Sequence, residues 1–183
     1  MKGAARGLGN LFVAPRRFFA ARAEEPGGNV EATTFAFACQ IAACIVDWTW
    51  YRLGWSLQGK QLSAFETLPR YMLAQMALFA LLLPLEALAV QLLLRSLGSA
   101  RVGFGATYRV CAYTQACVVL NIIPFVGWVL GGVGTVALLI IGIREVHTTS
   151  IGSAVFVATV GLFRLVVLAL LAILGVMTLL HYR

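Results

Sequence analysis

Three ionisable residues, Asp47, Glu86 and Arg164, lie within long apolar runs of this sequence. An ionised side chain inside a bilayer is costly without a partner, so each one marks a candidate functional position. Glu86 and Arg164 lie roughly 12 and 16 Å from the same membrane face at the rise of an α-helix, and we predict that they pair. The pair would be either a neutralised structural tie or a proton or ion relay. Asp47 lies nearer the opposite face, where water, Arg52 or Lys60 would be its partner.

The remaining reactive residue types form no catalytic, cofactor-binding or metal-binding motif. His147 has Glu145 and Ser150 nearby, but no glycine motif of a nucleophile elbow or oxyanion hole accompanies them. The cysteines make no Cys-x-x-Cys pair and lie in apolar runs, as small helix-packing residues do; they are Cys39, Cys44, Cys111 and Cys117. We therefore expect a protein that is not an enzyme and binds no metal or cofactor.

The composition identifies the surroundings that these residues need. Of 183 residues, 61% are hydrophobic and 11% are charged, against about 45–50% and about 25% in soluble domains. A spanning helix takes about 20 mostly apolar residues. We therefore predict an all-α integral membrane protein, a bundle of five transmembrane helices, over residues 33–183. The expected spans are Thr33–Tyr51, Tyr71–Leu94, Tyr108–Ile123, Phe125–Ile143 and Ser153–Leu180.

The third and fourth expected spans are separated only by Pro124. Proline cannot continue a helical hydrogen-bond ladder, so residues Asn121 to Gly127 are predicted to form a tight turn between two antiparallel helices. Gly127 and Gly131 have the spacing of small residues that allows helices to approach closely. They would serve either packing within the chain or a dimer face.

Positive charge predicts the orientation of the bundle. With a cytoplasmic N-terminus, nine Lys and Arg residues would lie inside and four outside, with Arg164 in a span. Such an excess favours a cytoplasmic N-terminus and a C-terminus on the outer side. Since the cations flank apolar runs, the net charge of +7 indicates contact with lipid head groups, and we expect no nucleic acid partner.

Residues 1–32 are expected to form a short amphipathic N-terminal arm and linker, separate from the bundle. Aromatic and basic residues alternate along the arm at roughly helical spacing, with Pro15 between them: Phe12, Arg16, Arg17, Phe18 and Phe19. Such a segment either lies in the membrane interface, with its apolar side toward lipid, or docks a partner protein.

Five short segments follow one another along the chain: Pro15–Phe19, Leu92–Gly98, Phe104–Tyr113, Ile122–Gly127 and Gly142–Ser150. Taken in order, they resemble the Yip (Ypt/Rab-interacting protein) membrane-domain family in its bacterial form. Pro15–Phe19 is similar to the Pro-x-x-Phe-Phe start of these proteins, and Phe104–Tyr113 to their Phe-x-x-x-x-Arg-Val-x-x-Tyr segment. Ile123–Gly127 resembles their Ile-Pro-x-x-Gly hairpin, and Gly142–Ser150 their Gly-Leu-Arg-x-x-His-x-x-Ser loop. The Asp-Leu-Tyr-Gly-Pro signature of the eukaryotic branch is absent, so Rab binding is not implied.

The resemblance implies five spans with a cytoplasmic N-terminus, in the bacterial cytoplasmic (inner) membrane. The candidate contact surface for lipid or a partner is the inner end of the third and fourth spans, with Arg109, Tyr113, Arg144 and His147. We expect a non-enzymatic scaffold, adaptor or accessory subunit that acts on membrane lipids or other membrane proteins, or that self-associates. The alternative is a small transporter or channel that uses Glu86 and Arg164.

Overall fold

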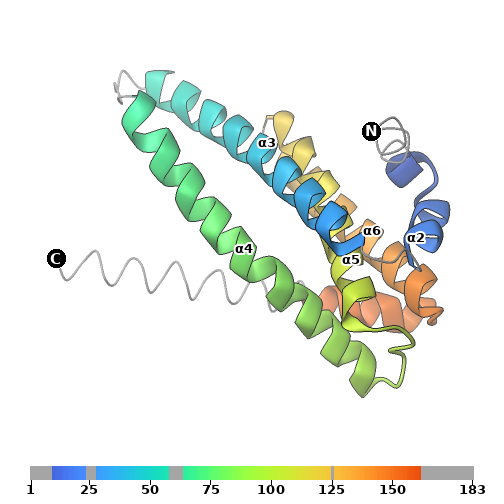
Figure 1. Ribbon diagram of the computed structural model, residues 1–183. Coiled ribbons are helices and arrows are strands. Elements are labelled where there is room, and N and C mark those ends of the chain that lie inside the picture. Colours follow the sequence, from blue (N-terminus) through green and yellow to red (C-terminus); the bar gives the residue numbers. More distant parts are fainter. Residues whose placement is uncertain (1–9, 24–27, 58–63, 125, 162–183) are drawn as a thin grey trace.

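The computed structural model describes residues 10–23, 28–57, 64–124 and 126–161, and all regular structure within them is helical (Figure 1). The helices are α2 (Pro15–Ala23), α3 (Gly28–Leu57), α4 (Ala64–Ser96), α5 (Phe104–Thr114), the 3₁₀ helix η1 (Gln115–Ile122) and α6 (Gly127–His147). A further helix covers Ile151–Gly161.

Three of the described helices are long and apolar enough to cross a membrane. They are Gly28–Gly54 in α3, Met72–Ser96 in α4 and Gly127–His147 in α6, with 27, 25 and 21 residues. At 1.5 Å per residue even the shortest extends about 32 Å, which matches a hydrocarbon core of about 30 Å. The chain is therefore a multi-pass integral membrane protein by the length and composition of its helices.

Four of the expected spans correspond to described helices, with different ends. α3 begins at Gly28 and not at Thr33, so five residues assigned to the linker belong to a helix. α4 runs through both Pro69 and Pro84, and α6 continues past Ile143 to His147. The expected fifth span, Ser153–Leu180, lies within the described residues only as far as Gly161.

The third expected span is helical but changes its geometry halfway. α5 is an α-helix, whereas η1 is a 3₁₀ helix of eight residues. The glycines of α6 lie directly against this segment. A Cβ atom on Gly127 would collide with the carbonyl oxygen of Leu120, and one on Gly131 would lie 3.0 Å from that of Cys117. Close approach of two backbones therefore accompanies the narrower helix, and the sequence pattern alone does not reveal it.

These contacts confirm the predicted hairpin. From Gly127 to Gly142, α6 meets residues of falling number, Leu120, then Cys117, then Val110. α6 is consequently antiparallel to η1 and α5, with the chain reversing between Ile122 and Gly127. Since Gly127 and Gly131 are buried against η1, they serve packing within the chain and are not open to a second copy.

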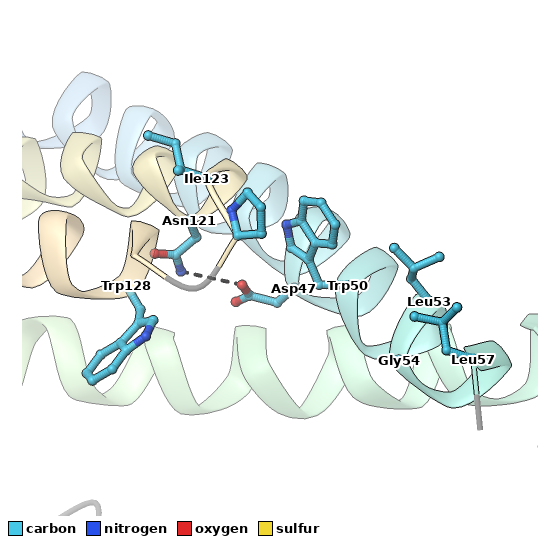
Figure 2. Close-up of a pocket in the computed structure, with 9 residues that line it drawn as sticks. Asp47, Trp50, Leu53, Gly54, Leu57, Asn121, Ile123 and Trp128 are labelled. Atoms are coloured by element: carbon cyan, nitrogen blue, oxygen red, sulfur yellow. Dashed lines mark hydrogen bonds between the residues drawn. The ribbon is translucent and has the colours of Figure 1, made fainter.

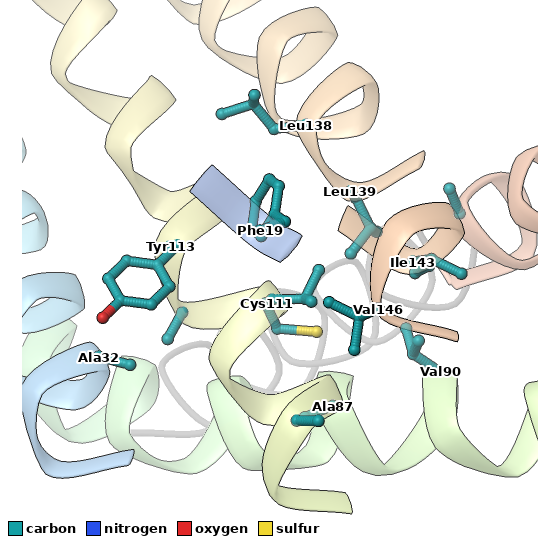
Figure 3. Packing of buried hydrophobic residues seen from close by; sticks show 14 of the residues in the cluster. Phe19, Ala32, Ala87, Val90, Cys111, Tyr113, Leu138, Leu139, Ile143 and Val146 are labelled. Atoms are coloured by element: carbon teal, nitrogen blue, oxygen red, sulfur yellow. The ribbon is translucent and has the colours of Figure 1, made fainter. Parts of the chain in front are cut away.

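The helices alternate in direction, so their ends gather in two groups. The start of α3, the end of α4, the start of α5 and the end of α6 meet through polar contacts at one end of the bundle, which we call the arm end because α2 packs there (Figure 1). At the hairpin end, α3 contacts η1. The core takes residues from α2, α3, α4, α5, η1 and α6, among them Phe19, Val90, Cys111, Tyr113 and Ile143 (Figure 3).

Candidate functional site

The N-terminal arm packs against the bundle at the arm end. Ala14 interrupts the helix of residues 10–13, and α2 begins at Pro15, a position that suits proline because its missing N–H has no helical partner there. Phe18 and Phe19 are 5% and 1% exposed and lie in the core (Figure 3). This corrects the expectation that the apolar side of the arm faces lipid, since both rings face the bundle.

Aromatic contacts fix the position of the arm. The Phe18 ring meets the Phe19 and Tyr113 rings edge to face, with centroids 5.5 and 5.0 Å apart. Phe19 lies beside Gly142 of α6, where a Cβ atom would approach its ring to 3.2 Å. The arm therefore occupies a space that a glycine leaves open. Phe12 and Arg17, also predicted to be interfacial, are exposed.

Arg22, at the end of α2, connects the arm to two other helices. Its Nη1 lies 2.8 Å from the Glu31 carboxylate of α3 and donates to the Tyr113 hydroxyl of α5 at 3.2 Å. Its guanidinium also lies 5.6 Å from the centroids of both the Phe18 and Tyr113 rings. The side chain of Arg22 is only 18% exposed, so this ion pair is better shielded from water than a surface pair.

Two further contacts join the start of α3 to α5. Arg109 Nη1 donates to Asn29 Oδ1 at 3.1 Å, and the Thr33 and Tyr108 hydroxyls are 2.9 Å apart. Gly105, one turn before Arg109, leaves room for the Asn29 side chain, since a Cβ atom there would lie 3.1 Å from its Nδ2. Early extension of α3 to Gly28 is what brings Asn29 within reach.

A directional chain of hydrogen bonds is buried beneath these contacts. Thr107 donates to Gln91 Oε1, and Gln91 Nε2 donates to the Val102 carbonyl at 3.1 Å. The Thr107 hydroxyl has a single proton, so it accepts from His147 Nε2, which lies 2.9 Å away. His147 therefore carries a proton on Nε2. Its Nδ1 has no hydrogen-bond partner among the described residues.

Five arginines lie at the arm end outside this hydrogen-bond network, and we call them the arginine surface. They are Arg16, Arg17, Arg95, Arg101 and Arg144, and none of them is buried. Arg16 Nε approaches Glu145 at 3.7 Å, and the Arg16 side chain is 67% exposed. A group of exposed guanidinium groups at the end of a membrane bundle is suited to anionic head groups.

The four predicted contact residues thus divide into two kinds. Tyr113 and His147 are buried, and they hold helices together and do not form a contact surface, which corrects that prediction. Arg109 is half-buried and bound to Asn29, whereas Arg144 remains at the surface. The Tyr113 hydroxyl instead accepts a hydrogen bond from Arg22 of α2.

The predicted Glu86–Arg164 pair remains a prediction, because Arg164 lies outside the described residues. Glu86 is half-buried in α4, next to Ala87 and one turn before Val90, both of which lie in the core. Among the described residues, no hydrogen bond or ion pair reaches its carboxylate.

Asp47 has a different partner from those predicted. Its Oδ1 accepts from Asn121 Nδ2 of η1 at 3.5 Å (Figure 2). Arg52, one of the predicted partners, lies over the Trp48 ring, 5.2 Å from the centroid, and Lys60, another, lies outside the described residues. Position along one helix could not reveal the Asn121 contact, since the hairpin brings it close from another element.

Reasoning from ionisable residues misses Gln91 and Thr107, which carry no charge but are 2% and 0% exposed. The available signal was a polar side chain in an apolar run, which needs a partner when it is buried. The same signal applies to Asn121 beside the predicted turn.

Comparisons with protein-family models, with curated proteins and with solved structures find no match to this chain. The resemblance to the Yip family therefore stays a prediction from the sequence. The geometry of the described helices carries the argument about function.

Proposed function

We propose that this chain is a non-enzymatic membrane scaffold or adaptor of the Yip type, and that the arginine surface at its arm end binds anionic lipid or the acidic face of another membrane protein. The observation that carries the proposal is the docked arm. Arg22, Phe18 and Phe19 fix α2 against the bundle, so Arg16 and Arg17 are held at the arm end, where Arg16 approaches Glu145 of α6. A fixed group of cations binds a charged partner with less loss of conformational entropy than a flexible arm would.

The proposed architecture has five spans, with the arm end in the cytoplasm. α5 and η1 together have 19 residues, 11 and 8. At about 1.5 and about 2.0 Å per residue they extend roughly 32 Å, which is long enough for a fourth crossing. The helix Ile151–Gly161 would begin the fifth crossing. The gathering of arginines at the arm end supports a cytoplasmic side for it.

The test is chemical cross-linking in native membranes, followed by purification and identification of bound protein and retained lipid. We expect a partner or an anionic lipid to co-purify with the wild-type chain. Replacement of Arg16 and Arg17 by glutamate should reduce its recovery at least about fivefold, since both charges are reversed. Arg52→Gln, which removes an arginine from α3 outside the arm end, is the matched control. Equal recovery with both variants would contradict the proposal.

Transport remains the second candidate because Glu86 lacks a partner among the described residues while lying in a candidate span. The two cavities described around Asp47 and around the arm are not lined by Glu86, which favours the scaffold. Proton uptake into proteoliposomes distinguishes the two functions. Uptake that is lost in Glu86→Gln would support transport and overturn the scaffold as the main function.

A further inference from the structure

A pocket of about 450 Å³ opens at the hairpin end, at the opposite end of the bundle from the arginine surface (Figure 2). Two elements build it, the last turns of α3 and the hairpin between η1 and α6. Its lining combines one carboxylate, one amide, two indoles and aliphatic groups. The polar and aromatic side chains are those of Asp47, Trp50, Asn121 and Trp128, and Leu53 and Leu57 are among the aliphatic ones. Its volume lies within the range of small-molecule sites.

Among the described residues, the Asp47 carboxylate has no cationic partner. Lys60, one of its predicted partners, lies outside the described residues. Asn121 donates to Oδ1 at a long 3.5 Å, and no Lys, Arg or His contacts Asp47 among the described residues. The nearby Arg52 is turned to the Trp48 ring. A carboxylate in a candidate span is expected to have a charge partner, so a cation supplied from outside the described chain would complete this site.

The two indoles define which cation fits. Trp50 and Trp128 line the pocket on either side of Asp47 and come from different elements (Figure 2). Tryptophan gives the strongest cation–π attraction, and an alkylated ammonium group, which is weakly hydrated, benefits most from it. Leu53, Leu57 and Ile123 supply contacts for an apolar body and offer no partner to a second charge.

The depth of the pocket indicates an amphiphile. Asp47 lies seven residues before Gly54, the end of the candidate span, which is about 10 Å along the helix. Trp50 and Trp128 are 38% and 71% exposed, so the pocket is open on the outside of the bundle. A ligand that partitions into the membrane interface reaches this opening directly.

From this geometry we propose that the hairpin-end pocket binds a lipophilic cation, an alkylammonium group on an apolar body, with Asp47 as its counter-ion and Trp50 and Trp128 against its faces. The site is independent of the scaffold function proposed above, because it uses other residues at the other end of the bundle. Either proposal can fail without the other.

The test is isothermal titration of the purified full chain in a maltoside detergent with hexyltrimethylammonium. The matched ligand is hexanesulfonate, which has the same chain and the opposite charge. We expect saturable binding of the cation only. Asp47→Asn, which keeps the shape and can still accept from Asn121, should weaken binding about tenfold or more. Trp50→Leu and Trp128→Leu should each weaken it about threefold to tenfold through loss of the cation–π contact.

One control and one check on folding keep the outcome decisive. Glu145→Gln is the control, since it removes a carboxylate at the arm end and should leave binding unchanged. Among the test variants, Trp128→Leu changes a side chain that is 71% exposed, so this variant should still fold. Unsaturable uptake, equal binding of hexanesulfonate, or wild-type affinity in folded Asp47→Asn would each overturn the proposal.

Discussion

At the scale of single residues, short neutral side chains hold the arm end together. Thr107 connects α4 to α6 through Gln91 and His147, and all three are buried. A buried hydrogen bond contributes modestly when it is made, but an unmade one costs the full desolvation of the group. The buried hydrogen-bond chain therefore matters more to stability than the exposed Arg16–Glu145 pair, which water screens.

Thr107→Val should destabilise the protein, because valine has the same shape but offers no hydroxyl to Gln91 and His147. Two buried polar groups then lose a partner, and we expect the free energy of unfolding to fall by roughly 1–3 kcal/mol. Titration with sodium dodecyl sulfate, followed by circular dichroism, measures this. Thr34→Val, which removes an exposed hydroxyl bonded within its own helix, is the control and should change little. An equal loss of unfolding free energy in both variants would contradict a stabilising role for the buried hydrogen-bond chain.

For some single residues, the sequence alone was enough to predict their surroundings. Burial of the four cysteines was predicted from their apolar surroundings and is confirmed. Asp47 and Glu86 were recognised as unusual, but the contact of Asp47 with Asn121 was not predicted, because Asn121 belongs to an element that folds back onto α3. Charge and depth identify a residue that needs a partner. Only tertiary packing determines which residue becomes that partner.

At the scale of elements, glycines control how closely the helices approach. α6 has one glycine face against η1, with Gly127 and Gly131, while a Cβ atom on Gly132, on another face, would meet no atom within 4 Å. Helix-helix approach through small residues is a main source of stability when lipid removes the hydrophobic advantage of burial. The sequence left packing within the chain and a dimer face as alternatives for these glycines, and it did not predict the 3₁₀ geometry of η1.

Gly127→Ala and Gly132→Ala form a matched pair in the same helix. The first methyl group would collide with the Leu120 carbonyl, so the hairpin must shift, and we expect a loss of roughly 1–3 kcal/mol. The second enters open space, where alanine is the better helix former, and should be neutral or stabilising by up to about 1 kcal/mol. Thermal unfolding in detergent measures both. Equal midpoints in the two variants would contradict the described packing of α6 on η1.

Gly98 ends α4 by a different mechanism. Its φ is +64°, and the bonds Ser99 N–H to Leu94 O at 2.8 Å and Gly98 N–H to Arg95 O at 3.0 Å form the Schellman pattern. Gly98→Ala should cost about 1 kcal/mol or more through left-handed strain alone, since nothing lies within 4 Å of the site. Gly103→Ala is the control, because Gly103 has φ of −74° and equally open surroundings. A midpoint shift in Gly103→Ala as large as in Gly98→Ala would refute this account.

At the scale of the whole molecule, both proposed sites depend on the alternating direction of the helices, which gathers the helix ends into the arm end and the hairpin end. The lengths of the apolar runs predicted the helices, Pro124 predicted the hairpin, and charge predicted the grouping of arginines. The described contacts bear out the hairpin and the antiparallel order. The sequence did not predict that the arm enters the core. Phe18 and Phe19 have an amphipathic spacing that suits lipid and protein equally, and the opening beside Gly142 decides between them.

The alternating order predicts which loops share a side of the membrane. If α5 and η1 cross together, residues 97–103 and 148–150 lie on the arm side, whereas the ends of α3 and η1 lie on the other. Single cysteines at exposed positions report this through a membrane-impermeant maleimide, with the wild-type chain as background because its four cysteines are buried. In intact cells Ser56→Cys and Ile123→Cys should react, and Ser96→Cys and Ser150→Cys should react only after permeabilisation. Ile123→Cys reacting together with Ser150→Cys would exclude the crossing by α5 and η1. A full exchange of the two groups would reverse the orientation, and the arginine surface would then face the outer leaflet.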